Sequence, residues 1–245
     1  MTELFYTLPD LLALLVVIAG IALQTIVGIG FGLLAAPLLY LIDPAFVPGP
    51  ILLLAGLLSL LVVLKQHQQL SWRRIMPAIL ARIPGAWFGA LLLVSAPAPL
   101  LGLLFGSVLL LAVLCTWRRF ELPLNRTSLT IGGFISGLIG TATSVGGPPI
   151  AMLYMNSDRL TARNEIAAFF LIGTPLSLLM LGLEGGFGFS QLALSLKMLP
   201  GLAIGWALGT QLDSRIDARS AKPAILLISL LSALMVLWDA LSSLL

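Results

Sequence analysis

Two cations lie inside apolar stretches of a chain whose other charged residues mostly fall between such stretches. Arg82 comes two residues before a Pro-Gly pair at 84–85, and Lys197 comes three residues before a second Pro-Gly pair at 200–201. A charged side chain inside a membrane is costly and usually faces a cavity or a partner. Two cations in matching places would attract a small anion, although each side chain is also long enough to extend to the nearer membrane surface. We predict that both contact an anionic substrate.

The apolar sequence is also interrupted twice by residues that favour irregular backbone. Glycines alternate with apolar residues at 28–32, and Gly, Thr, Ser and Pro dominate the stretch 140–149. Irregular backbone at membrane depth persists only where it faces protein or a water-filled cavity, and the free N–H groups at the start of a half-helix favour an anion. Glycines can also serve only to bring helices close together, which is our interpretation of Gly20, Gly89, Gly132 and Gly205.

Hydroxyl side chains occur in the second interruption and not in the first, so the predicted site is asymmetric. Gln24 is a further neutral candidate, although a hydrogen bond between helices is an equally good interpretation of it. Beyond the two cations Arg82 and Lys197, the predicted substrate contacts are Gln24, Gly28, Gly30, Gly32, Thr141, Thr143, Ser144, Gly146 and Gly147.

Residues suited to catalysis or metal binding are scarce. The chain has one histidine, His67, and one cysteine, Cys115, too few for the usual metal ligand sets. A hydrolase acting on a lipid phosphate needs a carboxylate or a histidine beside the anion, and neither interruption contains one. We therefore predict no enzyme activity, no cofactor and no metal. The acidic residues lie near the ends of apolar stretches, so no carboxylate proton relay is visible.

The composition requires a membrane. Only 9% of the 245 residues are charged, against about 25% in a soluble domain, so a water-facing surface cannot be built. A membrane-spanning helix needs about 20 mostly apolar residues. The sequence predicts such helices at 47–64, 75–94, 100–117, 164–183, 191–211 and 223–241.

Basic residues occur in alternate loops. The loops near Asp43, Pro97 and Glu184 contain no Lys or Arg. Because basic loops stay in the cytoplasm, these bare loops are predicted outside, and so are both termini. The predicted cytoplasmic residues are Lys65, Arg73, Arg74, Arg118, Arg119, Arg126, Arg159, Arg163, Arg215, Arg219 and Lys222.

Two further stretches, 8–42 and 128–155, are too long for one crossing and short for two. The loop assignment makes each of them enter and leave the membrane on the same side. We therefore predict two helical hairpins, either re-entrant or made of two short helices, each broken at its glycine-rich interruption.

The two halves of the chain share a pattern. The spacing of two glycines and a proline in 20–37 recurs in 132–149, and Pro-Gly-x3-Gly at 84–89 recurs at 200–205. Each half reads as a broken hairpin followed by three helices, and the halves have opposite orientations, which is typical of secondary transporters. The sequence predicts an all-α polytopic membrane protein with one transport domain, 1–245, made of inverted repeats at about 8–117 and about 127–242.

In these stretches the chain resembles the TauE/SafE (sulfite exporter, TSUP-type) membrane permease family. The resemblance rests on the Gly-x7-Gly-x-Gly-x-Gly-x4-Pro pattern of 20–37, on its partner at 132–140 and on the two Pro-Gly segments, and it covers essentially the whole chain. It implies transport of small, often sulfur-containing anions, such as sulfite, sulfoacetate or thiosulfate, across a bacterial inner membrane. Phe31 interrupts the family's glycine triplet, and the hydroxyl-rich stretch 141–149 departs from it further.

Together these observations predict a secondary transporter for a small anion that works by alternating access around two hairpins meeting near the midplane. The resemblance implies that this anion is a sulfur-containing oxyanion, an organosulfonate or an organic acid. The expected partners are the substrate and the lipid bilayer. A homo-oligomer is an alternative that the sequence leaves open. Nucleic acid is not expected, because the basic residues behind the net charge of +3 fit one membrane face. An anion channel and, less well supported, an intramembrane lipid-phosphate enzyme are the alternatives.

Overall fold

The computed structural model describes residues 6–28, 31–66, 70–118, 122–213, 215 and 218–243, and within them it contains helices and no strand. The prediction of an all-helical protein is therefore confirmed. In chain order the helices are α1 (Leu8–Val27), α2 (Phe31–Ile42), the short 3-10 helix η2 (Pro44–Phe46), α3 (Gly49–Gln66), α4 (Trp72–Ser95), α5 (Ala98–Arg118), α6 (Arg126–Thr143), α7 (Gly147–Leu153), α8 (Arg159–Leu183), α9 (Phe189–Lys197), α10 (Leu199–Leu212) and α11 (Ala218–Ser242).

Among the described residues, five helices are long and apolar enough to cross a membrane: α1, α4, α5, α8 and α11. The pair α9 and α10, bent by 40°, makes a sixth span if it crosses as one unit. Apart from residues 47–48, which precede α3, each predicted span lies within helix, but 191–211 is divided at Met198. Pro200 accounts for the division, because its ring clashes with the carbonyl four residues earlier and it has no N–H to donate. The chain is a multi-pass membrane protein.

Both stretches predicted as hairpins are broken near the middle. The break between α1 and α2 begins at Gly28, and α6 ends at Ser144; both residues have left-handed backbone, with φ of 84° and 64°. A left-handed residue ends a helix readily, and glycine adopts it without steric cost. With seven residues, α7 is only about 10 Å long, a third of a hydrocarbon core of about 30 Å. The α6–α7 hairpin therefore does not make two full crossings.

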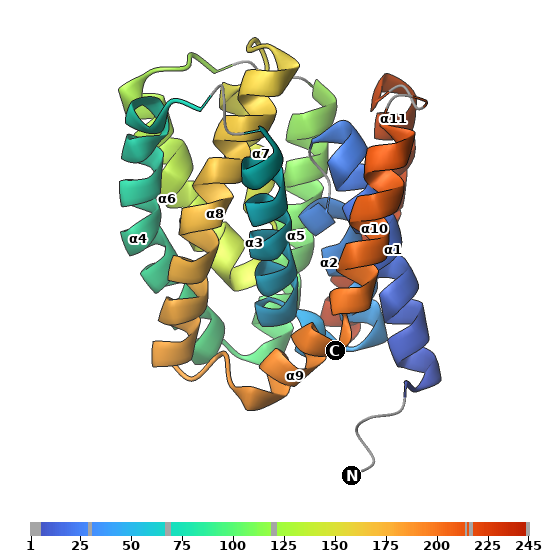
Figure 1. Cartoon of the computed structure of the whole chain (residues 1–245). Coiled ribbons are helices and arrows are strands. Elements are labelled where there is room, and N and C mark those ends of the chain that lie inside the picture. Colours follow the sequence, from blue (N-terminus) through green and yellow to red (C-terminus); the bar gives the residue numbers. More distant parts are fainter. Residues whose placement is uncertain are drawn as a thin grey trace.

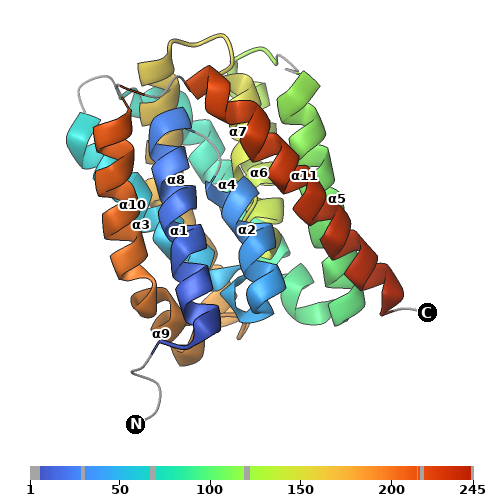
Figure 2. The ribbon, with the colours of Figure 1, turned by 90° about the vertical axis from the view of Figure 1, so that its right-hand side faces the viewer.

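The ends of the helices fall into two groups. The facing ends of α3 and α4, α5 and α6, α7 and α8, and α10 and α11 lie at the upper end of the molecule in Figure 1. The connections that follow α2, α4 and α8 lie at the lower end of the molecule. Figure 2 shows that α1 starts and α11 ends at this same lower end. The upper end contains the basic connections of the sequence, and the lower end contains Asp43, Pro97 and Glu184.

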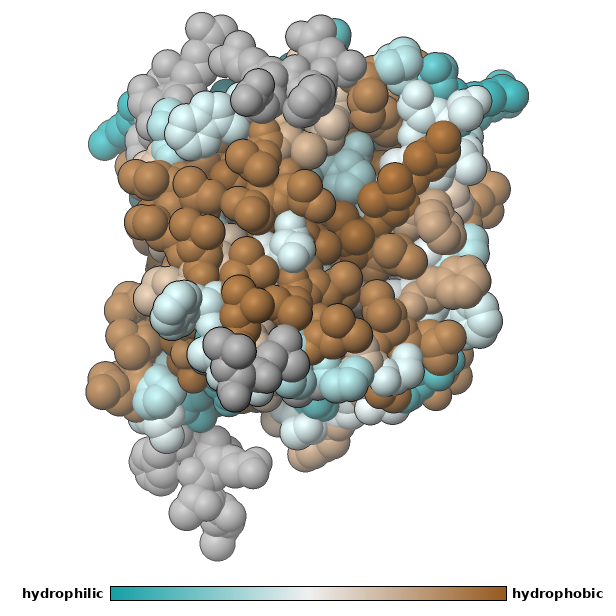
Figure 3. All heavy atoms as spheres, turned by 180° about the vertical axis from the view of Figure 1, so that it is seen from behind, coloured by the Kyte–Doolittle hydropathy of each residue, from teal (hydrophilic) through white to brown (hydrophobic). Residues whose placement is uncertain are grey.

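The outer surface is apolar over its middle. Figure 3 shows a broad hydrophobic band between two more hydrophilic ends. Large apolar side chains are exposed along several helices, for example Leu80 on α4, Leu111 on α5 and Leu231 on α11. Proteins in water rarely expose contiguous apolar patches larger than a few hundred Å². The band is therefore the surface that contacts lipid.

Glycines let two pairs of helices pack backbone to backbone. On α4, a Cβ added to Gly89 would run into the carbonyl of Leu138 on α6. On α10, a Cβ added to Gly205 would lie 2.7 Å from the carbonyl oxygen of Ile18 on α1. Small residues at such contacts are how membrane helices approach closely. Each helix with a Pro-Gly motif is thereby held against the first helix of the hairpin in the other half of the chain.

Candidate functional site

The two helix breaks meet at the centre of the molecule. A Cβ added to Gly32, in the first turn of α2, would lie 2.6 Å from the carbonyl oxygen of Ser144, at the end of α6. The hydroxyl of Ser144 donates to the carbonyl of Pro48, just before α3, at 2.9 Å. Gly32 is therefore required for contact between the breaks, and Ser144 joins that contact to the start of α3.

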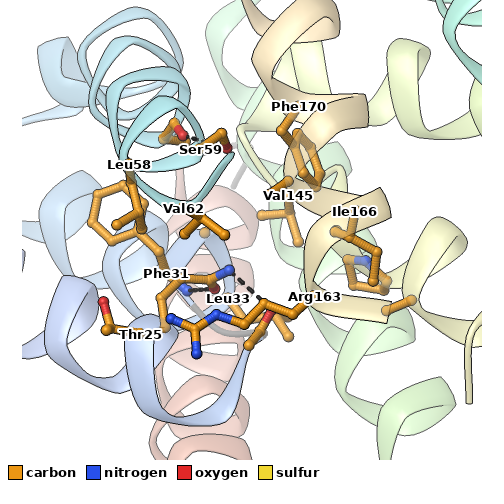
Figure 4. A pocket seen from close by; sticks show the side chains of 18 of the residues that line it. Thr25, Phe31, Leu33, Leu58, Ser59, Val62, Val145, Arg163, Ile166 and Phe170 are labelled. Atoms are coloured by element: carbon orange, nitrogen blue, oxygen red, sulfur yellow. Dashed lines mark hydrogen bonds between the residues drawn. The ribbon is translucent and has the colours of Figure 1, made fainter. Parts of the chain in front are cut away.

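A cavity that is partly open to the outside lies against both breaks and is bordered on its other sides by α3 and α8. Figure 4 shows side chains from α1, α2, α3 and α8 converging on it. Among the predicted substrate contacts, those that line it are Gln24, Gly28, Gly32, Ser144 and Gly147. The remaining described residues of its wall are Thr25, Phe31, Leu33, Ala55, Leu58, Ser59, Val62, Val145, Pro148, Ala151, Arg163, Ile166, Ala167 and Phe170.

Gln24 closes the first break. Its side-chain amide donates to the carbonyl of Gly28 at 3.0 Å, and its side-chain oxygen accepts from the N–H of Phe31 at 2.9 Å. Backbone groups released by a break in a membrane helix must be satisfied within the protein. Gln24 thus supplies hydrogen bonds that the missing helical turn cannot, while it also lines the cavity.

The sequence analysis did not select Arg163, the one cation among the described residues of the cavity wall. Its side chain is 11% exposed and extends from α8 across the cavity towards the side where Thr25 lies (Figure 4). Its Nη1 lies 3.6 Å from a carboxylate oxygen of Asp213, after α10. Arg159, one turn earlier on α8, pairs with the same carboxylate at 2.8 Å and donates to the carbonyl of Ile26. The signal in the sequence is the four-residue spacing of the arginines, which puts both on one face of a helix.

A second cavity adjoins the first on the side of the two arginines. It shares Gly28 and Arg163 with the first cavity and continues to Arg159, Tyr154 and Thr116. These last residues lie at or beside the ends of α8, α7 and α5 that face the basic end of the molecule. The two cavities together lead from the helix breaks towards that end.

Arg82 lies behind the cavity and not in its described wall. The side chain is completely buried, and its guanidinium donates to the hydroxyls of Ser136 at 3.2 Å and Ser177 at 3.1 Å. Its Cζ lies 4.8 Å from the ring centre of Phe169 and 5.1 Å from that of Phe170. Phe170 also lines the cavity. An aromatic ring therefore stands between the charge and the cavity.

The same polar network reaches the second break. Ser136, which accepts from Arg82, donates to the carbonyl of Gly146 at 2.6 Å. Thr141 donates to Ser177 at 2.8 Å. Two predicted substrate contacts, Thr141 and Gly146, therefore belong to the same hydrogen-bond network as Arg82. None of these three residues is in the described cavity wall. In this arrangement Arg82 positions the break through Ser136.

The remaining predicted contacts lie apart from the cavity. Thr143 donates to the carbonyl of Ile139 at 2.6 Å, within α6. Lys197, at the end of α9, pairs with Asp10 near the start of α1 at 2.6 Å. Gly30 falls outside the described residues. Contact between substrate and Arg82, Lys197, Thr141, Thr143, Gly146 or Gly30 therefore stays a prediction.

One carboxylate is completely buried. Glu165 on α8 accepts from the hydroxyl of Tyr154 at 2.7 Å and lies 3.4 Å from Nη1 of Arg74. Burial, followed by the hydrogen bond to Glu165, raises the pKa of Tyr154, so its hydroxyl stays protonated and keeps donating. The group joins the ends of α4, α7 and α8 beside the second cavity.

Comparison with curated proteins and with solved structures gave no match. The family model described as "Sulfite exporter TauE/SafE" matches residues 12–236, nearly the whole chain. The match includes all the described residues that line both cavities, both helix breaks and the five candidate spans for at least most of their length. The chain belongs to the TauE/SafE sulfite exporter family, a family of membrane transporters.

Proposed function

We propose that this protein is a secondary transporter that carries a small anion by alternating access, and that the cavity between the two helix breaks holds the substrate. One observation carries the proposal: two broken helices meet at a cavity into which a single described cation, Arg163, extends. In secondary transporters, substrate sites are formed by broken helices near the midplane. A guanidinium is always charged and forms paired hydrogen bonds to a carboxylate or a similar oxyanion.

Helix packing supports the inverted repeat within this proposal. If α1–α2 corresponds to α6–α7, α3 to α8, α4 to α9–α10 and α5 to α11, exchanging the halves maps the main contacts onto one another. The contact of α4 with α6 becomes that of α10 with α1, and the contact of α2 with α11 becomes that of α7 with α5. The contacts of α3 with α8 and α5 with α11 map onto themselves. This exchange is what two repeats related by a two-fold axis would give.

The arrangement of the cavities supports a conformation open to the cytoplasm. The second cavity leads to the end with the basic connections, which the positive-inside rule assigns to the cytoplasm of a bacterial inner membrane, with both termini outside. On the other side, the hydrogen bond from Ser144 to Pro48 and the contact of Gly32 with Ser144 close the centre. We infer that separating these contacts opens the opposite side, while Arg159, Arg163 and Asp213 come closer together.

The test is uptake of labelled sulfite, methanesulfonate and acetate into vesicles that contain the purified chain, measured for wild type and for Arg163→Gln. Loss of a hydrogen bond to a charged group costs about 1.5–3 kcal/mol, so uptake should fall by about tenfold or more. Arg163→Lys should retain part of it, because charge remains while the paired geometry is lost. Arg126→Gln, which removes an exposed arginine at the start of α6, is the matched control.

Saturable uptake that depends on Arg163 and not on Arg126 would support the proposal. Absence of uptake for every anion would contradict it. Ion flux that does not saturate and far exceeds carrier turnover would assign the protein to the channel alternative instead. Wild-type uptake by Arg163→Gln would remove Arg163 from the site.

A further inference from the structure

Resting on the proposed function, we propose that the buried carboxylate of Glu165 is a proton-binding site that couples anion transport to protons. In the conformation described above, Glu165 is charged and paired with Arg74. It carries a proton when the opposite side of the protein is open, so one proton moves with each anion. The depth of the carboxylate, its incomplete hydrogen bonding and its position between the two repeats lead to this assignment.

Glu165 lies deeper than the sequence suggested. Its position places it about 9 Å along α8 from the first residue of that helix, and the residue is 0% exposed. A buried carboxylate is costly unless it is paired or protonated. Carboxylates buried inside membrane proteins are typical of proton pathways. Glu165 is thus the kind of group that the sequence analysis looked for in the middle of the apolar stretches.

The two oxygens of this carboxylate are bonded differently. Oε2 accepts from the hydroxyl of Tyr154 at 2.7 Å. Oε1 accepts no hydrogen bond from the described residues, and its charge is balanced by Nη1 of Arg74 at 3.4 Å, in the first turn of α4. An ion pair and a bound proton are the two ways to avoid a bare buried charge. Oε1 is therefore the oxygen that can take a proton when Arg74 is absent.

Among the described residues, Arg74 is the one cation that pairs with Glu165. Helix α8 packs against α3, α4, α6 and α7. Tyr154, directly after α7, contributes a hydroxyl and no charge. On α8 itself, Arg159 and Arg163 pair with Asp213. The remaining charged side chains described on or beside these helices form no ion pair with Glu165: Lys65 on α3, Arg73 and Arg82 on α4, Arg126 on α6 and Asp158 before α8.

The ion pair joins the two predicted repeats. Arg74 belongs to the first repeat, whereas Glu165 and Tyr154 belong to the second. Alternating access moves one repeat against the other, so the contact of Arg74 with Glu165 can open during the cycle. The side chain of Arg74 is 45% exposed, and it can therefore withdraw into water at little cost. Glu165 stays among apolar neighbours of α7 and α8, such as Leu153 and Phe169, and then needs a proton.

The second cavity provides the route for that proton. Tyr154, which is bonded to Glu165, lines this cavity together with Arg159 and Arg163. When Arg74 returns to Glu165, the proton leaves Oε1 for water in the second cavity. The anion held by Arg163 leaves through the same cavity. Proton and anion are thus released on the same side, which makes the transporter a symporter.

Accumulation driven by a proton gradient tests the assignment. Vesicles that contain the purified full chain are made more acidic outside than inside, and potassium with valinomycin holds the membrane potential near zero. Labelled methanesulfonate and sulfite are followed, with empty vesicles as a correction for diffusion of protonated sulfite. Methanesulfonate stays ionised, so its accumulation reports protons that the protein carries. One proton per anion should give about tenfold accumulation for each pH unit. Exchange of label without a gradient measures anion movement alone.

Three variants separate a proton site from a structural ion pair. Glu165→Gln imitates the protonated carboxyl, so it should lose accumulation while exchange continues. Glu184→Gln, at the other end of α8, is the matched control and should accumulate like wild type. Arg74→Gln breaks the ion pair but keeps the carboxylate. It should move accumulation to higher pH without abolishing it, because a carboxylate without its cation binds a proton more readily.

The outcomes separate the inference from the proposed function. Accumulation that is lost in Glu165→Gln and shifted in Arg74→Gln supports the inference. The same defect at every pH in both variants, or normal accumulation by Glu165→Gln, overturns it. Exchange without accumulation by wild type also overturns it, but leaves an anion transporter. If neither anion enters or exchanges, the proposed function fails together with the inference. Should Glu165→Gln not fold, Arg74→Gln decides, because accumulation with an unshifted pH range contradicts a proton on Glu165.

Discussion

The surroundings of Arg82 and Lys197 differ sharply although the two residues precede similar Pro-Gly motifs. Arg82 lies within a continuous α4, is completely buried and donates to two serine hydroxyls. Lys197 ends α9, beside the bend at Met198, and pairs with Asp10 at 2.6 Å. Its backbone carbonyl accepts from the hydroxyl of Tyr6 at 2.7 Å. The same sequence pattern thus forms part of one continuous helix in one half and of a bent helix pair in the other.

The neighbouring helices explain the difference. Glycines of α4 and α6 fit against each other's backbone, and this tight contact supports a continuous helix despite Pro77 and Pro84. Next to the bend, Gly201 of α10 lies closest to side-chain carbons of Leu14 and Val17, which leave more room for adjustment, and the α9–α10 chain bends at its proline. Equivalent motifs therefore need not give equal rigidity, because a helix is held by what packs against it.

The largest effect is expected from adding one methyl group to each Pro-Gly motif. In Gly85→Ala the new Cβ would overlap the backbone carbonyl of Phe134, which cannot move alone. In Gly201→Ala it would lie 3.0 Å from a side-chain carbon of Leu14, which can rotate. We expect Gly85→Ala to lower the free energy of unfolding by about 3 kcal/mol and Gly201→Ala by less than about 1 kcal/mol. Thermal unfolding in detergent measures both.

Equal losses of stability in Gly85→Ala and Gly201→Ala would contradict the difference in rigidity between α4 and the α9–α10 pair. Gly147→Ala provides a control for the substitution itself, because its new Cβ would meet no atom within 4 Å.

Smaller effects are expected when Arg82 and Lys197 are each replaced by methionine, which removes the charge and keeps a long side chain. One substitution should mainly reduce uptake, and the other should mainly reduce stability. Arg82→Met should reduce anion uptake by about tenfold, because Ser136 loses the donor that orients its hydroxyl towards the Gly146 carbonyl. Its stability should fall little, because a buried charge without a carboxylate among the described residues is itself costly. Lys197→Met should instead lower the free energy of unfolding by up to about 1 kcal/mol. Uptake and unfolding are measured on the same preparations.

These variants also test the contacts predicted from the sequence. If Lys197→Met abolished uptake with unchanged stability, Lys197 would be a substrate contact as the sequence suggested. If Arg82→Met unfolded the protein and Arg82→Lys restored uptake fully, a positioning role through paired hydrogen bonds would be wrong.

The smallest effect is expected at the second break. Ser144→Gly relieves a left-handed backbone that costs a residue with a side chain about 1 kcal/mol. It also removes the hydrogen bond to Pro48, worth about 1 kcal/mol. The two changes should leave the free energy of unfolding within about 0.5 kcal/mol of wild type. A loss of 2 kcal/mol or more by thermal unfolding would show that the link to Pro48 contributes more than one ordinary hydrogen bond.

Much of the fold could be predicted because lipid imposes strong rules on sequence. Apolar runs gave the helices, glycine and proline gave both breaks, and alternate basic loops correspond to one end of the molecule. The division at Met198 was not predicted, since the same motif at Pro84 does not divide its helix. Only the neighbours of each helix distinguish the two cases.

The sequence pointed to part of the cavity wall but not to its cation. Gly28, Gly32, Ser144 and Gly147 do line the cavity. Arg163 was assigned to a cytoplasmic loop because it lies close to the start of α8, and its inward direction depends on Asp213, which is distant in sequence. Likewise the pairing of Lys197 with Asp10 joins opposite ends of the chain. Side-chain direction at helix ends is set by such tertiary partners, which a single sequence does not display.

The short length of α7 has an electrical consequence. Its seven residues extend over about 10 Å of a low-dielectric layer about 30 Å thick. If the proposed anion moves between the basic end and the second break through this low-dielectric depth, it crosses about a third of the transmembrane voltage drop. At about 2.3 kcal/mol per charge for each 100 mV, that step alone changes the binding free energy by about 0.8 kcal/mol per 100 mV. In the proposed alternating-access cycle, the rest of the voltage would fall across the closed half, so the membrane potential would act mainly on the conformational change.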